Sequence, residues 1–515
     1  MTPDRRSCRP VAISAFDLDG AYDLLVHGCE DCACAVTDSR ALNTSEATQS
    51  ALGRRDARWV SAHEVIDWAL DAEHRLLFNP IGHGGVVVVN EAAHRVFQAF
   101  RQPVTFTEAQ VPSVEDRENA VDVMRRLGEL EMIYPHGRPQ RPEFASGKVL
   151  TAWLHITNAC NLECPYCYVN KSSEPMDEGT GRAAVRAVMK SASDHGFTGV
   201  KLKYAGGEAS LNHHLMVQLH AYARELADKH GLTLYSTLLS NGVALRPTLI
   251  DWLKANDVQV MVSLDGVGSR HDAQRPTRNG KPSFKLVERG ISRLTERNHP
   301  PHLSITITNR NADGIADAVR YALERNLTFS LNLFRDNDCA TAFPDLRYEE
   351  QTIISGLLEA FGVIEEYLPP WSVLGSILDR GQLLEQRQRS CGVGEDYVVI
   401  DQHGKVAKCH MEIEKTLGDV FSDDPLQLIR QDKTTALNLV VDEKEGCRDC
   451  SWRYWCTGGC TVATFRATGR YDIKSPNCNI YRAIYPQALR LEGLRLLKYA
   501  PALATEDLDQ ILQRR

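Results

Sequence analysis

Three closely spaced cysteines constrain this chain more than any other feature. Cys160, Cys164 and Cys167 are separated by three and then by two residues, and Tyr166 directly precedes the last of them. Thiolates are the usual protein ligands of iron–sulfur clusters, and a [4Fe–4S] cube has four irons that each need a ligand. Three cysteines leave one of these irons without a protein ligand. The spacing therefore predicts a cluster with one open position, at which a small molecule can chelate.

Zinc is the alternative for such a group of cysteines. A structural zinc site takes four ligands, commonly as paired C-x2-C or Cys/His elements. The sequence near 160–167 holds no second pair. An iron–sulfur cluster is therefore the favoured interpretation, with zinc kept as the alternative.

The C-x3-C-x2-C spacing resembles the signature of the radical S-adenosylmethionine (radical SAM) enzymes. The resemblance implies that the open iron binds the amino and carboxylate groups of SAM. An electron from the cluster then cleaves SAM to methionine and a 5′-deoxyadenosyl radical, which removes a hydrogen atom from a C–H bond. In such an enzyme the cofactor supplies the radical chemistry, and the protein supplies ligation, orientation and a dry pocket.

From about residue 150 onward, strand patterns alternate with helix patterns, which is typical of an α/β fold with a parallel sheet. Six such units resemble the partial (β/α)6 barrel of the radical SAM family. Chemistry in parallel α/β barrels takes place at the C-terminal ends of the strands, and the cysteine loop follows the first strand. The expected strands are 150–156, 200–205, 232–240, 258–264, 302–308 and 327–334, with helices at 181–195, 211–230, 247–256, 284–298 and 311–326.

Polar motifs follow the next three expected strands and resemble the SAM-binding motifs of the family. The two glycines before Glu208 allow a ligand to approach the backbone closely. The guanidinium of Arg275 matches the fork geometry of a carboxylate such as that of SAM. An ordinary turn is the alternative for each motif. The residues that the resemblance assigns to SAM binding are Tyr166, Gly206, Gly207, Glu208, Ser240, Asn241, Ser263 and Arg275.

Seven further cysteines lie between residues 391 and 478, and their spacing resembles that of the SPASM domain. Radical SAM enzymes that modify peptides and proteins carry this domain. The resemblance implies two auxiliary [4Fe–4S] clusters, which with the SAM-binding cluster makes three. It assigns the distal one to Cys447, Cys450, Cys456 and Cys478, and the nearer one to Cys391, Cys409 and Cys460.

The nearer auxiliary site is one cysteine short of a complete cube. Relatives with a complete nearer site have another cysteine just before the position of Cys391, but residues 383–390 contain none. The fourth iron of this site is therefore expected either to stay open or to take another ligand. The candidate ligands are a water, a non-cysteine side chain and Cys339, which comes from another part of the sequence. An open iron would bind the thiolate of a substrate.

Residues 75–135 have the pattern of a small separate domain. Strands are expected at 75–80 and 85–90, followed by helices at 91–102 and 120–132. This order resembles the winged-helix peptide-recognition domains of peptide-modifying systems, among them the peptide chaperone of pyrroloquinoline quinone biosynthesis. Such domains bind a leader peptide as a strand added to the edge of the sheet. The alternative is a structural extension that only packs on the barrel.

The N-terminal segment is expected to be weakly structured, with residues 43–55 as a linker. Its Cys29, Cys32 and Cys34 are interpreted as unliganded thiols rather than as a metal or redox site, because three ligands make a poor structural zinc site. The expected domains are 1–60 (weakly structured), 61–145 (winged-helix-like), 146–370 (barrel), 371–490 (SPASM) and 491–515 (C-terminal helix).

Composition limits the cellular context. The formal net charge is −8, and no basic block suggests nucleic-acid binding. No run of about 20 apolar residues predicts a membrane span, and no apolar signal core follows the N-terminus. A content of 15 cysteines therefore argues for metal binding rather than for disulfides. These observations predict a cytoplasmic, oxygen-sensitive enzyme.

The resemblances together predict a radical SAM oxidoreductase that matures a ribosomally made peptide by a thioether or carbon–carbon crosslink. Its expected partners are a precursor peptide and a flavodoxin- or ferredoxin-type reductant. An epimerase, with Cys339 as hydrogen donor, is one alternative. A formylglycine-generating enzyme of the sulfatase type is less favoured, because its relatives have an aspartate where this chain has His410. The non-enzymatic alternatives are an iron–sulfur electron carrier and a zinc-dependent scaffold.

Overall fold

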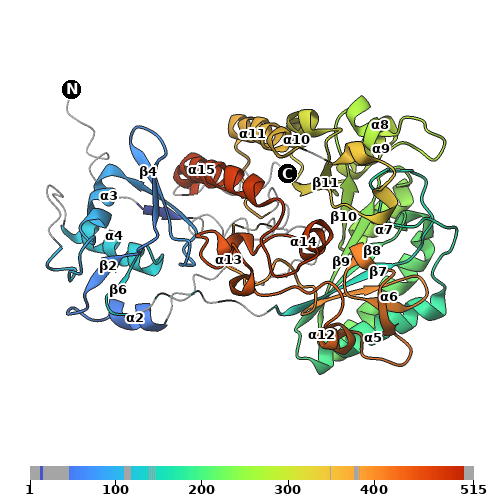
Figure 1. The fold of residues 1–515 in the computed structure, drawn as a ribbon, viewed down its shortest axis with the longest axis horizontal. Coiled ribbons are helices and arrows are strands. Elements are labelled where there is room, and N and C mark those ends of the chain that lie inside the picture. Colours follow the sequence, from blue (N-terminus) through green and yellow to red (C-terminus); the bar gives the residue numbers. More distant parts are fainter. Residues whose placement is uncertain are drawn as a thin grey trace.

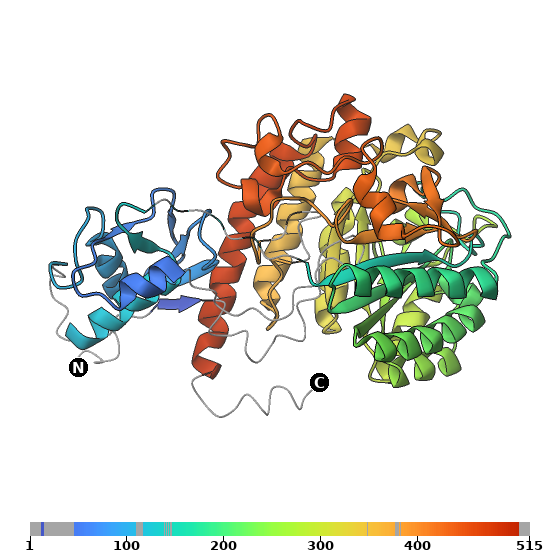
Figure 2. The ribbon, with the colours of Figure 1, turned by 90° about the horizontal axis from the view of Figure 1, so that it is seen from below.

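The computed structural model describes residues 12–14, 46–109, 117–138, 140, 142, 144, 147–347, 349–375, 381 and 383–503. Cys29, Cys32 and Cys34 lie outside these residues. The molecule is elongated, with the N-terminal domain at one end and the barrel at the other (Figures 1 and 2). Much of the C-terminal third of the chain lies between these two parts.

Six parallel strands in sequential order form the partial barrel, which confirms the predicted α/β fold. Every residue of the first two strands is buried, as expected for parallel strands covered on both faces. The strands are β7 (Val149–His155), β8 (Gly199–Ala205), β9 (Thr233–Ser240), β10 (Val258–Ser263), β11 (His302–Ile307) and β12 (Phe329–Leu333).

Helices connect these strands and cover the outer face of the sheet (Figure 1). The connecting helices are α5 (Glu178–Asp194), α6 (His213–His230), α7 (Pro247–Ala255), α8 (Ser269–Gln274), α9 (Phe284–Glu296) and α10 (Ile315–Glu324), followed by α11 (Glu350–Tyr367). Short 3-10 helices lie at η2 (Ala209–Asn212), η3 (Ala312–Gly314), η4 (Asp338–Ala340), η5 (Pro344–Leu346), η6 (His410–Glu412) and η7 (Val441–Glu443).

The sheet continues beyond the barrel into the C-terminal region, which the sequence did not predict. Strand β13 (Tyr397–Ile400) pairs in parallel with β7, and β14 (Lys405–Ala407) and β15 (Thr416–Asp419) follow in antiparallel order. Cys409 comes two residues after β14, so this pairing carries it to the barrel. The remaining helices are α12 (Pro425–Gln431), α13 (Arg453–Cys456), α14 (Thr461–Thr468) and α15 (Cys478–Leu503).

The N-terminal domain is built on a four-stranded antiparallel sheet with the order β1-β5-β4-β3. Its strands are β1 (Ala12–Ser14), β3 (Ile66–Ala69), β4 (His74–Phe78) and β5 (Val86–Asn90), and β2 (Trp59–Ser61) pairs separately with β6 (Ile133–Pro135). Helices α3 (Glu91–Gln98) and α4 (Arg117–Glu129) belong to the same domain. The segment expected to be a linker instead contains helix α2 (Glu46–Leu52), whose Ala51 is buried in the domain core.

The two faces of this N-terminal sheet have different neighbours, as the two-residue period of a strand requires. Leu77, Val87 and Val89 pack in the core that contains α3 and α4. Leu76 and Phe78 belong instead to the large core that includes the barrel and α15. The N-terminal domain therefore packs on the rest of the chain through one sheet face.

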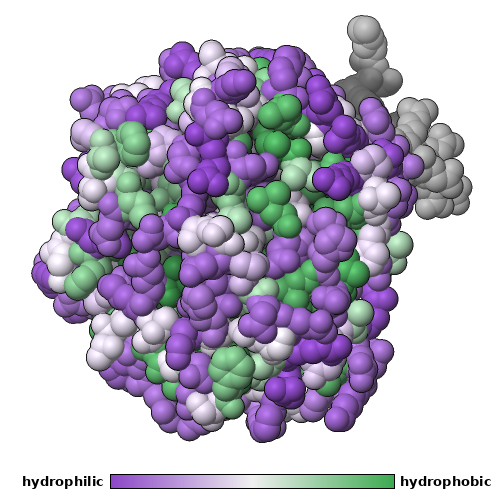
Figure 3. Space-filling view, turned by 90° about the vertical axis from the view of Figure 1, so that its right-hand side faces the viewer, coloured by the Kyte–Doolittle hydropathy of each residue, from purple (hydrophilic) through white to green (hydrophobic). Residues whose placement is uncertain are grey.

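Helix α15 lies beside the N-terminal sheet and separates it from the barrel (Figure 2). The sequence placed the C-terminal helix at 491–515, but the helix begins earlier, at Cys478. On the barrel end of the molecule, hydrophilic side chains predominate and hydrophobic ones form separate small groups (Figure 3). Among the described helices, none has the length and apolar character that a membrane span needs.

Candidate active site

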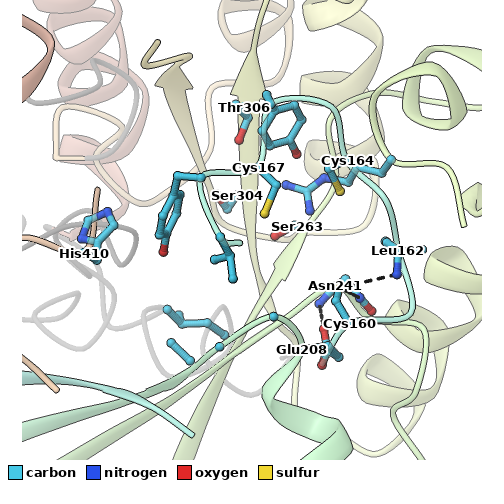
Figure 4. A pocket seen from close by; sticks show the side chains of 18 of the residues that line it. Cys160, Leu162, Cys164, Cys167, Glu208, Asn241, Ser263, Ser304, Thr306 and His410 are labelled. Atoms are coloured by element: carbon cyan, nitrogen blue, oxygen red, sulfur yellow. Dashed lines mark hydrogen bonds between the residues drawn. The ribbon is translucent and has the colours of Figure 1, made fainter. Parts of the chain in front are cut away.

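The cysteine loop after β7 lies at one wall of a cavity of about 210 Å³ at the C-terminal ends of the barrel strands. Cys160, Cys164 and Cys167 all line this cavity (Figure 4). The backbone N–H of Leu162 donates to the Cys160 sulfur at 3.4 Å, and the Asn241 amide nitrogen lies 3.9 Å from the same sulfur. The loop therefore presents three thiols to one space, as the spacing predicted.

Gly206 and Gly207 allow the end of β8 to approach the cysteine loop. A Cβ atom on Gly206 would lie 2.3 Å from the Thr157 carbonyl oxygen, and one on Gly207 would lie 2.5 Å from that of Ala159. The Gly207 N–H donates to the same Thr157 oxygen at 2.7 Å. We had expected these glycines to admit a ligand, and the structure shows that they first admit the backbone that carries Cys160.

Glu208 organises the polar side of the cavity. Its carboxylate is 2% exposed and accepts hydrogen bonds from the Ser240 hydroxyl at 2.8 Å and from the Asn241 backbone N–H at 2.6 Å. Burial raises the pKa of Glu208, while these donors lower it. The side chain of Asn241 in turn donates to the Asn161 side chain in the cysteine loop at 2.6 Å. One hydrogen-bonded network therefore connects β8, β9 and the cysteine loop.

Arg275 is held by Asp265 at the next strand end. The Arg275 Nε donates to the Asp265 carboxylate at 2.7 Å, and the Tyr166 hydroxyl donates to the same oxygen. Burial disfavours the charged form of Arg275, but the Asp265 carboxylate holds its pKa well above the usual value. From the sequence, only Ser263 of this strand end was assigned to SAM binding and Asp265 was not, although it lies two residues after the end of β10. Its position at a strand end was the signal that could have identified it.

All eight residues assigned to SAM binding from the sequence line this one cavity, together with the three cysteines. The other walls were not predicted, because most of their residues come from parts of the chain distant from the cysteine loop. These further lining residues include Trp153, Tyr168, Lys171, Thr306, Phe334, Arg335, His410 and Met411.

His410 comes from the C-terminal region and lies across the cavity from Cys160 and Cys164 (Figure 4). Its ring stacks on Trp153 with the ring centroids 4.6 Å apart, and its Nδ1 lies 2.9 Å from the Tyr397 hydroxyl. These contacts fix the position of the imidazole in the cavity wall.

Cys339 lies on η4, where its side chain is exposed. Its thiol lies 3.7 Å from the Tyr168 carbonyl oxygen, and burial raises the pKa of this thiol. Cys339 is near the barrel mouth, as expected, but it is not among the residues that line the cavity.

The four cysteines assigned to the distal cluster line a second, much smaller cavity of about 20 Å³. Cys447 and Cys450 face it from one loop, Cys456 from the end of α13, and Cys478 from the start of α15. Trp452, Tyr481 and Tyr485 also line it. The structure therefore brings together four cysteines that span the sequence from 447 to 478.

Cys391, Cys409 and Cys460 belong to a third group, in a hydrophobic cluster with Trp153 and Tyr397. Cys339 is not a member of this cluster. The Asn438 amide nitrogen and the Ser390 hydroxyl lie 3.8 and 3.9 Å from the Cys391 sulfur. The grouping matches the set that the sequence assigned to the nearer auxiliary site.

The three groups of thiols have the chemistry to hold iron–sulfur clusters, whose irons take thiolate ligands. Within the described part of the chain, no group of three or more His, Cys, Asp or Glu residues is placed to hold one metal ion. A cube bonds each thiolate to a different iron, so its ligands lie further apart than those of one zinc ion. Burial raises the pKa of Cys160 to about 11 and that of Cys164 and Cys447 to about 12. The positive charge of bound iron would reverse this effect and keep the thiols ionised.

Comparisons with known proteins agree with this geometry. Residues 154–322 match the radical SAM superfamily. An uncharacterized protein of Methanocaldococcus jannaschii, MJ0907, is 26% identical over 197 residues, which cover 38% of this chain and 66% of that protein. The sporulation killing factor maturation protein SkfB of Bacillus subtilis is 29% identical over 192 residues, which cover 36% of this chain and 44% of SkfB. The chain thus spans less than two thirds of the length of either relative.

A longer match joins the chain to the cysteine-type anaerobic sulfatase-maturating enzyme of Clostridium perfringens. The two are 23% identical over 338 residues, which cover 59% of this chain and 86% of that enzyme. The solved structure of native anSMEcpe with bound AdoMet and Cp18Cys peptide has the same fold, with a TM-score of 0.55 and 19% identity. The match covers 67% of this chain and 99% of that structure. Residues 154–322 therefore carry a radical SAM domain.

Proposed function

We propose that this chain is a radical SAM maturase that removes a hydrogen atom from a ribosomally made precursor peptide and installs a crosslink. The main support is that the three cysteines of the loop and all eight predicted SAM-binding residues line one cavity at the strand ends. Two further groups of cysteines support auxiliary iron–sulfur sites. SkfB, which is 29% identical to this chain over 192 residues, is named as a sporulation killing factor maturation protein.

Different residues of the cavity would bind the cluster, orient SAM and exclude water. Cys160, Cys164 and Cys167 would hold the SAM-binding cluster. Bound SAM and the three clusters would supply two things. One is the radical that removes the hydrogen atom, and the other is an acceptor for the electron released on crosslinking. Glu208 and Arg275 would position the SAM amino and carboxylate groups, because their charges oppose those of SAM. The aromatic wall of Trp153 and Tyr168 would exclude water from the reacting carbon.

A thioether is the favoured crosslink. Cys391, Cys409 and Cys460 supply one thiolate fewer than a cube needs. A cysteine of the substrate can complete this set, since bound iron lowers the pKa of a thiol and fixes its sulfur. The test compares the electron paramagnetic resonance spectrum of the auxiliary clusters with native precursor and with a Cys→Ser core variant. A change with the native peptide alone supports thiolate binding, and identical spectra argue for a carbon–carbon crosslink.

The N-terminal domain would recognise the leader of the precursor. Strand β3 is an edge strand of its sheet, and the Trp68 side chain on it is 36% exposed. An edge strand offers unpaired backbone groups to an added peptide strand. Trp68→Ala should weaken precursor binding about tenfold, as for an exposed aromatic anchor. Phe421→Ala is the matched control, because Phe421 is exposed on a different domain. Equal affinity for the Trp68 variant and the control would remove the recognition role.

A formylglycine-generating reaction is the second candidate, since the match to the sulfatase-maturating enzyme covers 59% of this chain. His410 follows Cys409, at the position where the sulfatase-type enzymes that the sequence resembles have an aspartate. The ring of His410 is clamped by Trp153 and Tyr397. Incubation with a sulfatase-derived cysteine peptide decides between the two: an aldehyde product detected by mass spectrometry would favour this candidate.

The overall proposal is tested by cofactor content and by SAM cleavage. Anaerobically reconstituted protein should contain about twelve irons with matching sulfide, as three cubes require. Reduced with dithionite, or by a flavodoxin or ferredoxin, it should convert SAM to methionine and 5′-deoxyadenosine. Protein that binds zinc instead and leaves SAM intact would point to the non-enzymatic scaffold. Iron–sulfur clusters without SAM cleavage would point to an electron carrier.

A further inference from the structure

Lys444 is a buried cation in the C-terminal region. It follows η7 directly and is 1% exposed, which places it among the largest fully buried side chains of the described residues. Burial of an ammonium group is costly unless the group is paired and hydrogen-bonded. The surroundings of Lys444 must therefore compensate its charge.

One compensating contact is a hydrogen bond across a tight turn. The Lys444 Nζ donates to the Thr457 carbonyl oxygen at 2.9 Å. Thr457 adopts a left-handed conformation, with φ at 56°, directly after Cys456. The turn that receives the ammonium therefore connects Cys456 of the distal set to Cys460 of the nearer set.

A glycine in this turn makes room for the lysine. Gly458 has φ at 77°, and a Cβ atom on it would lie 2.8 Å from Lys444 Cδ and 3.2 Å from its Nζ. The same Cβ would lie 3.4 Å from the Cys447 sulfur. The ammonium and the Cys447 sulfur therefore lie against the same face of Gly458.

The sulfur atoms around Lys444 come from both auxiliary sites. Burial lowers the pKa of Lys444, and four thiols oppose this effect: those of Cys447 and Cys456, which line the distal cavity, and those of Cys391 and Cys460, which belong to the other group. The lysine thus lies between two sets of thiols that become anionic when they bind iron.

We propose that Lys444 is a cation shared by the two auxiliary sites and that it raises the reduction potential of both. The proposal rests on the proposed auxiliary clusters. Reduction adds one electron from an external donor to a site that already carries thiolate charge. A positive charge nearby in a medium of low dielectric favours the more negative, reduced form. Lys444 acts through the clusters and is therefore a positioning residue rather than a catalytic one.

The test measures the midpoint potentials of the auxiliary clusters by a redox titration followed by paramagnetic resonance. Cys160→Ala, Cys164→Ala and Cys167→Ala serve as the background, so that only the auxiliary clusters report. Lys444→Met removes the charge and the hydrogen bond, whereas Lys444→Gln removes the charge and keeps a donor. Lys444→Arg keeps the charge. Lys474→Met is the control, because Lys474 lines the distal cavity but is exposed.

Both potentials should become more negative in the Met and Gln variants and stay near the parent values in the Arg variant and the Lys474 control. Loss of auxiliary iron in the Met and Gln variants, but not in the Arg variant, also supports the shared charge. Unchanged potentials, or equal iron loss in all three Lys444 variants, would overturn it. A parent protein without auxiliary iron would instead contradict the proposed cofactors, so the two failures are distinguishable.

Discussion

The barrel cavity and the distal cysteine cavity differ in volume, in number of cysteines and in the residues that line them. The barrel cavity is about 210 Å³ and has three cysteines on one wall, whereas the distal cavity is about 20 Å³ and has four. Polar groups such as Glu208 and Arg275 line the first, and the aromatic Trp452 and Tyr485 line the second. A site with a missing thiolate and free volume can admit a co-substrate. A closed site with a full set of thiolates can only hold a cluster and exchange electrons.

The backbone and side chains around the thiols also differ between the barrel cavity and the distal cavity. Two glycines bring the end of β8 against the barrel cysteine loop. The distal site borders the N-terminal domain, because Trp452, which lines its cavity, stacks on Phe78 with the ring centroids 5.9 Å apart. Nearby, the Trp455 indole nitrogen donates to the Pro80 carbonyl oxygen at 2.7 Å. Gln386 donates to the same oxygen at 3.0 Å. The distal site is thus part of the contact with the N-terminal domain.

The largest expected effect comes from removing the barrel thiols. Cys160→Ala, Cys164→Ala and Cys167→Ala together should abolish 5′-deoxyadenosine formation and remove about four irons, one cube. Chromatography of the nucleoside products and iron analysis measure both effects. Unchanged 5′-deoxyadenosine yield would contradict the assignment of this site.

The matching change at the distal site is Cys447→Ala with Cys450→Ala. We expect this variant to keep SAM cleavage and to lose crosslinked product, because the distal cavity shares no lining residue with the barrel cavity. Equal loss of SAM cleavage in the barrel and distal variants would contradict the prediction that only the barrel cavity is needed for this step.

A smaller but still large effect should follow from Gly207→Ala. Its Cβ would meet backbone oxygens of Asn158 and Ala159 at 2.6 and 2.5 Å, so the cysteine loop must move. We expect reduced iron at the barrel site and slower SAM cleavage, with the auxiliary iron retained. Gly362→Ala on α11 is the control, because nothing lies within 4 Å of its added Cβ. Normal barrel iron in the Gly207 variant would show that the loop does not need this close approach.

Trp455→Phe should have a moderate effect on stability. The change keeps an aromatic ring beside Phe78, whose centroid is 4.9 Å from that of Trp455, but it removes the indole donor to Pro80. The Pro80 oxygen keeps its hydrogen bond from Gln386, so the loss is that of one hydrogen bond, which is about 0.5–1.5 kcal/mol. Thermal unfolding should therefore begin at a lower temperature than in the exposed-site control Trp68→Phe. The same contact means that deletion of the N-terminal domain would expose the Trp455 face, so point substitutions are the better tests of recognition.

The smallest effect is expected for Cys339→Ala. Cys339 is exposed and does not line the barrel cavity, so crosslinking and SAM cleavage should stay close to the parent values. Product formed in deuterated water should carry the same deuterium content for the variant and the parent. Loss of solvent deuterium from the product would restore Cys339 as a hydrogen donor and favour epimerisation.

The sequence by itself determined the six strands and the three-cysteine loop, and the resemblance to the SPASM spacing implied the two groups of auxiliary cysteines. These features depend on local spacing and on short motifs at strand ends. It also identified Glu208 and Arg275, because the carboxyl ends of parallel strands meet at one edge of the sheet. It did not identify helix α2, whose small and polar residues show no clear period and whose burial depends on contacts with Trp59 and its neighbours.

Only the tertiary structure decided which distant segments share a site. The pairing of β13 with β7 brings His410 into the barrel cavity. The packing of one N-terminal sheet face places Pro80 on Trp455. The turn after Cys456 places Lys444 between two sets of thiols. Each of these contacts joins residues whose local sequence carries no sign of the partner, because strand pairing, burial and charge are settled only when the separate elements pack together.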